Sequence, residues 1–183
     1  MSSTIMDPTG GQEARSRREL ALAPRPSTLR GVRLGLLENG KQNARLFLEE
    51  LAAVLRERYG VEAAELRRKE VFTAPEPPER IEEMGSACDV IVTGIGDCGS
   101  CSASAVADGV LFERGGIPAA VICSDAFSST ADAIAEVNGA AGYRYLTTPH
   151  PVAGLTPEQV RERAESVAAE VAELLSAQAR QAA

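Results

Sequence analysis

The sequence predicts an α/β fold built on a doubly wound parallel sheet. From Val32 onward, short apolar runs alternate with amphipathic stretches, a pattern typical of parallel strands joined by crossover helices. Glycine, proline and helix-capping residues separate the runs, as expected where strands and helices end. The length of 183 residues, with 44% hydrophobic residues, suits a single domain with a sizeable core.

The chain is predicted to begin with an irregular arm. Residues 1–30 hold several turn formers and the breaker Pro24-Arg25-Pro26, so we expect an irregular arm or a small hairpin there. Residues 31–183 are expected to form the one α/β domain. Within it, the apolar residues 32–38 predict the first strand, and the amphipathic residues 42–59 predict the first helix.

The remaining elements continue this alternation. Short apolar runs bounded by turn formers predict strands at residues 61–67, 87–96, 118–123 and 143–147. Helices are predicted near residues 79–84, 102–114 and 129–137, with a C-terminal helix that begins at the cap Thr156-Pro157-Glu158. Five strands joined by right-handed crossovers predict a flavodoxin-like sheet of order 2-1-3-4-5.

Polar clusters follow four of the predicted strands. Glu38 to Lys41 follow the first strand, Asp97 to Cys101 the third, Ser124-Asp125 the fourth and His150 the fifth. In a sheet of this order, ligands bind beyond the carboxyl ends of the strands, where the strand order reverses between the first and third strands. We therefore expect a functional site at this edge.

Two cysteines lie three residues apart where the third strand gives way to a helix. The free N–H groups and positive dipole end of a helix favour thiolate over thiol. Cys98 is expected to be the more exposed and more acidic thiol, hence the nucleophile or redox centre, with Cys101 one turn on and within disulfide reach. Cys88 and Cys123 lie in apolar runs and are predicted to be core residues.

Further residues at the same edge have expected roles. His150, the only histidine, is held between two prolines, and this rigid mount suits a general acid or base. Asp97 is expected to orient a base or substrate, although a carboxylate beside a thiol opposes thiolate formation. The expected substrate-binding residues are Asn39, Lys41, Gly99, Ser100 and Asp125. A helix cap for Asn39 and a turn for Asp125 are the plainer alternatives.

Neither a metal nor an organic cofactor is expected. Cys98, Cys101 and His150 are zinc-ligand types, but the chain offers one close pair of them. The spacing Gly94-x-Gly96-x-x-Gly99 matches a dinucleotide fingerprint, yet cysteine occupies the turn and no acidic partner follows at the right strand end.

Composition excludes several classes of function. The net charge of −7 and the aromatic content of 4% argue against a nucleic-acid binder. The sequence has neither a membrane-spanning apolar stretch nor an apolar signal peptide, so a cytoplasmic protein is expected. Its four cysteines are then expected to be reduced, catalytic or metal-binding, and not a disulfide framework. A helix on a doubly wound sheet often forms dimers, and we expect a homodimer.

At these residues the chain resembles the UGSC family, named for a selenocysteine-Gly-Ser-Cys motif, written here as Cys98-Gly99-Ser100-Cys101. The resemblance covers nearly the whole chain. It includes Met6 to Gly10, Leu36 to Ala44, Gly115 to Pro118 and Pro149 to Val152. The motif is also similar to the redox region of the selenoprotein subunits of glycine and betaine reductases. Cys98 in place of selenocysteine lowers the expected reactivity, and the second domain of those subunits has no counterpart here.

These features predict a thiol-dependent enzyme that acts on a small organic substrate with an anionic or carbonyl group, which Asn39 and Lys41 would bind. The Cys98 thiolate would attack, Cys101 would resolve the product as a disulfide, and His150 would transfer protons. A reductant or a partner subunit is the other expected partner. Two alternatives stay open: a non-redox acid/base enzyme of the racemase or lyase type, and a metal-binding or partner subunit.

Overall fold

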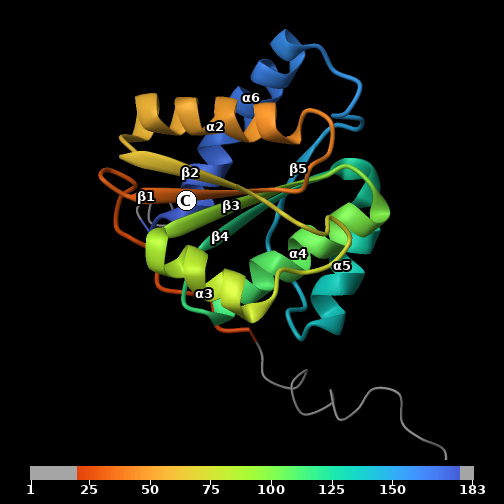
Figure 1. Ribbon diagram of the computed structural model, residues 1–183, viewed down its shortest axis with the longest axis horizontal. Coiled ribbons are helices and arrows are strands. Elements are labelled where there is room, and N and C mark those ends of the chain that lie inside the picture. The colour runs from red at the N-terminus through yellow and green to blue at the C-terminus, as the bar shows by residue number, and fades with distance from the viewer. Residues whose placement is uncertain (1–19, 178–183) are drawn as a thin grey trace, which may run out of the picture.

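The computed structural model describes residues 20–177, and these form a five-stranded parallel sheet with helices on both faces (Figure 1). The strand order is β2-β1-β3-β4-β5, which confirms the predicted flavodoxin-like order. The strands are β1 (Arg33–Glu38), β2 (Ala63–Arg68), β3 (Val90–Gly96), β4 (Ala119–Ser124) and β5 (Leu146–Thr148). The helices are α2 (Ala44–Tyr59), α3 (Pro78–Ala87), α4 (Gly99–Arg114), α5 (Ser128–Val137) and α6 (Pro157–Leu175), and a 3-10 turn, η1 (Asp125–Phe127), precedes α5.

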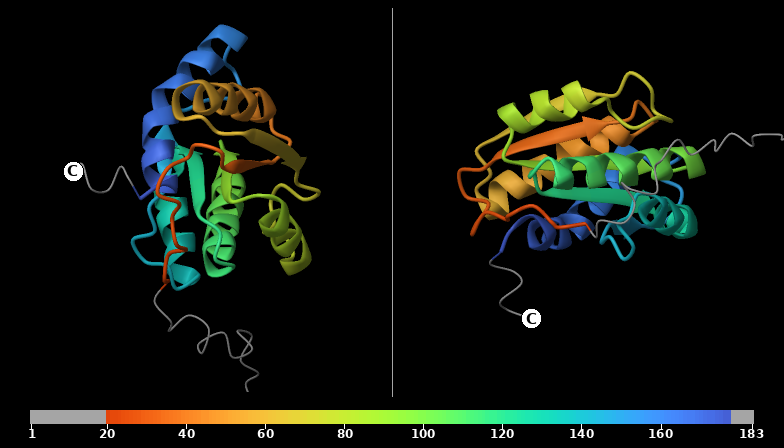
Figure 2. Two further views of the ribbon diagram at one scale, coloured as in Figure 1. Left: turned by 90° about the vertical axis from the view of Figure 1, so that its left-hand side faces the viewer. Right: turned by 90° about the horizontal axis from the view of Figure 1, so that it is seen from below.

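The helices form two layers. Helices α2 and α6 cover one face of the sheet, and α3, α4 and α5 cover the other (Figures 1 and 2). Alternate side chains of a strand pack against opposite layers of helices. Val92 of β3 lies in the core under α2 and α6, and Ile91 lies in the core under α3 and α4. Every residue of β3 is buried, as expected for a central parallel strand covered on both faces.

The N-terminal segment is tied to the domain by a buried ion pair. The Arg25 guanidinium lies 2.6 Å from a carboxylate oxygen of Glu113 in α4, and both side chains are almost fully buried. Residues 20–31 form neither helix nor strand. The expected arm or hairpin over residues 1–30 lies largely outside the described residues, as does the quoted stretch Met6 to Gly10.

Candidate functional site

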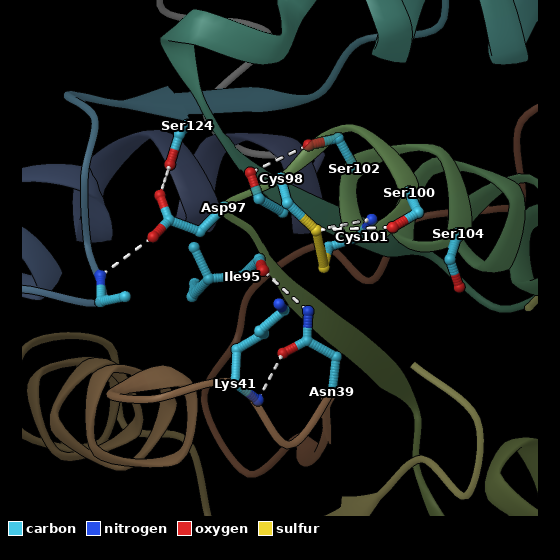
Figure 3. The surroundings of a disulfide bond; sticks show 12 residues. Asn39, Lys41, Ile95, Asp97, Cys98, Ser100, Cys101, Ser102, Ser104 and Ser124 are labelled. Atoms are coloured by element: carbon cyan, nitrogen blue, oxygen red, sulfur yellow. Dashed lines mark hydrogen bonds between the residues drawn. A yellow bond between two sulfur atoms is a disulfide. The ribbon is translucent and has the colours of Figure 1, made fainter. Parts of the chain in front are cut away.

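The two motif cysteines lie at the N-terminus of α4 and form a disulfide bond (Figure 3). Cys98 is the N-cap residue, with extended backbone, and its sulfur accepts the backbone N–H of Cys101 at 3.2 Å. The Ser100 hydroxyl oxygen lies 3.6 Å from the same sulfur. Helix N-caps normally use an oxygen for this contact, so the Cys98 sulfur takes the position where the helix N-terminus stabilises negative charge.

The two sulfur positions differ in burial. Cys101 is 1% exposed, whereas Cys98 is half-buried and Ser100 is exposed. A Cβ atom added at Gly99 would meet nothing within 4 Å, so the turn between the cysteines faces open space. Cys98 is therefore the sulfur that a reactant meets first.

The start of α4 is packed tightly against the end of β3. A Cβ atom at Gly96 would lie 2.8 Å from the Ser102 Cα atom and 2.8 Å from the Cys123 sulfur. The Ser102 hydroxyl donates to the Gly96 carbonyl oxygen at 2.9 Å. Cys88 and Cys123 are both buried, as predicted, and burial raises the pKa of the Cys123 thiol to about 12.

Asn39 and Lys41 lie on the loop that follows β1, next to the disulfide. The Asn39 amide nitrogen donates to the Ile95 carbonyl at 2.7 Å, and its oxygen accepts the Lys41 backbone N–H at 3.2 Å. Asn39 therefore joins the ends of β1 and β3 instead of capping α2, which begins at Ala44. Figure 3 shows the disulfide directed toward Asn39 and Lys41.

Asp97 is the anchor of the loop that follows β5. Its carboxylate accepts the hydroxyl of Ser124, the backbone N–H groups of Val152 at 3.1 Å and Ala153 at 2.9 Å, and a contact of 3.0 Å from Nδ1 of His150. Burial acts to raise the pKa of Asp97, but these hydrogen bonds outweigh it and hold the pKa below its ordinary value. Figure 3 shows the side chain directed toward Ser124, away from the sulfur atoms.

His150 is oriented by three contacts at the ends of β3 and β4. Besides the Asp97 contact, its backbone N–H donates to the Asp125 carboxylate at 3.0 Å. Its ring meets Phe127 edge-on, with centroids 5.2 Å apart, and its side chain is 38% exposed. A hydrogen bond at one ring nitrogen fixes the tautomer and leaves the other for chemistry. Asp97, Asp125 and His150 thus form one cluster.

The Asp97→Asn substitution is expected to destabilise the protein by about 1–3 kcal/mol at neutral pH, because it replaces one of the two carboxylate oxygens on which the part-buried Ser124, Val152 and Ala153 donors converge. The folded-state pKa of Asp97 is depressed, so its stabilisation is present above the ordinary value of 3.8 and is lost as pH falls through the folded-state pKa. Urea denaturation of both proteins should show their free energies of unfolding converging below pH 3.8. An equal gap at pH 7 and at strongly acidic pH contradicts this account.

A buried cluster that the sequence patterns did not reveal joins α4 to the loop that follows β2. Lys69, which follows β2, forms an ion pair with Asp108 of α4 and donates to the Ser104 hydroxyl at 2.8 Å. Asp108 also accepts the Glu76 backbone N–H at 2.6 Å, and Ser104 donates to the Ala74 carbonyl at 2.8 Å. The one available signal was a single acidic residue within the apolar stretch of α4.

Asn43 was also missed as a positioning residue. It has a positive φ of 66° before α2, and its amide nitrogen donates to the carbonyls of Val152 and Leu155 at 3.0 Å each. It thereby joins the start of α2 to the loop that Asp97 holds from the other side. The loop that follows β5 is therefore fixed from two sides, by Asp97 and by Asn43.

Within residues 20–177, no three His, Cys, Asp or Glu side chains are grouped so as to hold a metal ion. None of the helices in that range has the length and apolar character required to cross a membrane.

Comparison with known proteins gives a family but little else. No curated protein matches the chain. Among solved structures, a diflavin flavoprotein A3 from Nostoc sp. aligns with a TM-score of 0.41 and 11% identity, over 83% of this chain and 98% of that one. The UGSC family model matches residues 4–177, which include the cysteine motif and the residues gathered around it. The chain therefore belongs to the UGSC family.

Proposed function

We propose that the protein is a thiol-dependent oxidoreductase that acts on a small organic substrate through the thiolate of Cys98, with Cys101 as the resolving thiol. The observation that carries this proposal is the position of the Cys98 sulfur. It caps α4, accepts the Cys101 N–H at 3.2 Å, and is the more accessible of a bonded pair. A helix N-terminus lowers a thiol pKa and makes the thiolate available at neutral pH.

The proposed reaction consumes a reduced dithiol and yields the disulfide. The Cys98 thiolate displaces a leaving group from an electrophilic atom of the substrate, forming a covalent adduct and releasing the group as an anion. The Cys101 sulfur then attacks the Cys98 sulfur, loses its proton, and expels the substrate fragment with the bonding electron pair. The fragment takes up a proton, so the substrate gains two electrons and the protein ends as the disulfide.

The proton donor proposed for this step is His150. Its ring is partly exposed, and the Asp97 contact at 3.0 Å orients it. A carbonyl group next to the substrate atom that is bonded to Cys98 would stabilise the electron pair left on that atom when the carbon–sulfur bond breaks. This favours a carbonyl-containing substrate. A dithiol reductant or a partner subunit must reopen the disulfide for a second cycle.

Alkylation of the reduced protein with iodoacetamide across pH, read by mass spectrometry, tests the proposal. Cys98 is expected to react with a midpoint below the ordinary thiol pKa of about 8.5, while Cys101 reacts more slowly because it is buried. Cys88 and Cys123, which are also buried, serve as internal controls and should stay unmodified in the folded protein. A Cys98 midpoint at or above about 8.5, or faster alkylation of Cys101, overturns the proposal.

A further inference from the structure

A pocket lined by basic side chains lies at the carboxyl ends of β1 and β2. Its volume is about 420 Å³, and its charged lining residues are Glu38, Lys41, Arg45 and Arg68. The chain as a whole carries a net charge of −7. A concave site with three cations on an acidic protein attracts anions against the overall charge.

The pocket adjoins the disulfide site through the sheet. Glu38 at the end of β1 pairs in register with Arg68 of β2 on one side and with Gly94 of β3 on the other. The cysteine motif begins just after β3 ends. Lys41 belongs to both places, because it lines the pocket and lies on the loop toward which the disulfide is directed (Figure 3).

The Arg68 side chain is 68% exposed, and its guanidinium lies over Glu38 and Gly40. Its Nε lies 3.5 Å from a Glu38 carboxylate oxygen, and the Glu38 side chain is itself 5% exposed. The other Glu38 oxygen accepts the Gly40 backbone N–H at 2.5 Å. A Cβ atom at Gly40 would lie 2.7 Å from Nη2 of Arg68, so the guanidinium packs directly on the glycine backbone. A guanidinium oriented in this way can bind a carboxylate with two parallel hydrogen bonds.

Lys41 is restrained. Its Nζ lies 4.9 Å from the centre of the Phe72 ring, within the range of a cation–π attraction. Phe72 belongs to the loop that the Lys69 and Asp108 cluster anchors through Glu76. The lysine is therefore held at the pocket by a loop with a buried attachment.

The charge balance of the pocket indicates the charge of the anion. Glu38 offsets one of the three cations, and Arg45 is paired with Glu49 at 2.8 Å. About one positive charge remains, which matches a single carboxylate. A phosphate dianion would carry an excess negative charge close to Glu38.

We propose that this pocket binds a carboxylate group of the small molecule on which Cys98 acts, an inference that rests on the proposed function for the identity of the ligand. Arg68 binds the carboxylate through its terminal nitrogens, and Lys41 contributes charge from the side of the disulfide. The substrate class is thus an organic acid whose reactive atom extends from the pocket toward Cys98.

Titration of the oxidised protein with propionate, followed by NMR, tests this inference without any thiol reaction. Propionate is expected to saturate at millimolar concentration and to shift amide signals around Gly40 and Arg68, whereas the uncharged isostere propionamide should cause no such shifts. Arg68→Gln should weaken propionate binding by at least about tenfold, because the paired hydrogen bonds are lost. Lys41→Gln should weaken it as well.

Arg58→Gln is the matched control, since Arg58 lines a second pocket of about 420 Å³ away from the site. It should leave the propionate affinity unchanged within about twofold, because it removes one arginine without touching the proposed ligand contacts.

Three results overturn the inference: absence of saturable propionate binding, equal binding of propionamide, or equal losses of affinity in Arg68→Gln and Arg58→Gln. Tighter binding of inorganic phosphate overturns its assignment to a carboxylate. Propionate binding with an unreactive Cys98 overturns the proposed function and the link between the ligand and Cys98, but not the carboxylate pocket. A reactive Cys98 without propionate binding overturns this inference alone.

Discussion

The Asp108→Ala variant is expected to lose about 3–5 kcal/mol of its free energy of unfolding, because it leaves the charged Lys69 buried without its partner. The two side chains are 2% and 0% exposed, for Lys69 and Asp108 respectively. The Glu76 backbone N–H loses its acceptor in the same variant. Urea denaturation at pH 7 measures the loss directly.

A double variant separates the charge from the packing. Lys69→Met combined with Asp108→Leu removes both charges and keeps side chains of similar size, so it should recover most of the stability lost in Asp108→Ala. A loss below about 1 kcal/mol in Asp108→Ala, or an equal loss in the double variant, contradicts the account. The cluster would then not depend on its ion pair.

The same pair predicts a dependence on pH. Burial raises the pKa of Asp108 from 3.8 to about 6, although Lys69 opposes the shift. A carboxyl group whose pKa is raised by folding contributes most stability below its unfolded-state pKa and loses that contribution as pH rises through the folded-state pKa. The stability of the wild-type protein relative to the double variant should therefore fall between pH 3.8 and about 6.

The fold was predictable because its signals are local. Each strand is a short apolar run, and the consecutive buried residues of β3 mark it as central. The boundaries were less accurate where capping decides them. The helix α4 begins at Gly99 instead of residue 102, because the Cys98 sulfur provides the cap. The strand β3 begins at Val90 instead of residue 87, because α3 continues to Ala87.

The long-range contacts of the site could not be predicted. Strand order placed the ends of β1, β3, β4 and β5 at one edge, which gathered the expected residues. It did not show that the Asp97 carboxylate would face the Val152 and Ala153 backbone, or that Lys69 would reach Asp108, since each pair is separated by many residues. Such contacts depend on side-chain directions across different loops, and a single sequence does not encode them as a pattern.

The Cys98→Ser and Cys101→Ser variants are expected to fail at different steps with an anionic aromatic disulfide such as 5,5′-dithiobis(2-nitrobenzoate). The reduced wild-type protein should release two aromatic thiolates per molecule and keep no adduct, because Cys101 displaces the second thiolate from Cys98. Cys101→Ser should release one and retain a mixed disulfide on Cys98. Cys98→Ser should react about 100-fold more slowly or worse, since its remaining motif thiol is buried.

Cys88→Ala is the matched control for these variants, because it removes one cysteine away from the motif and should behave as the wild-type protein does. Absorbance gives the released thiolate, and intact mass gives the adduct. A stable adduct on wild-type Cys98 would show that Cys101 does not resolve it. If substrate turnover is also unchanged in Cys101→Ser without any reductant, an acid/base mechanism replaces the proposed redox mechanism. In the acid/base mechanism a helix-capping thiolate removes a proton, and the disulfide is a resting form. The location of the Cys98 sulfur at the α4 N-terminus suits either chemistry, so the retained adduct decides between them, whereas the alkylation midpoint of Cys98 does not.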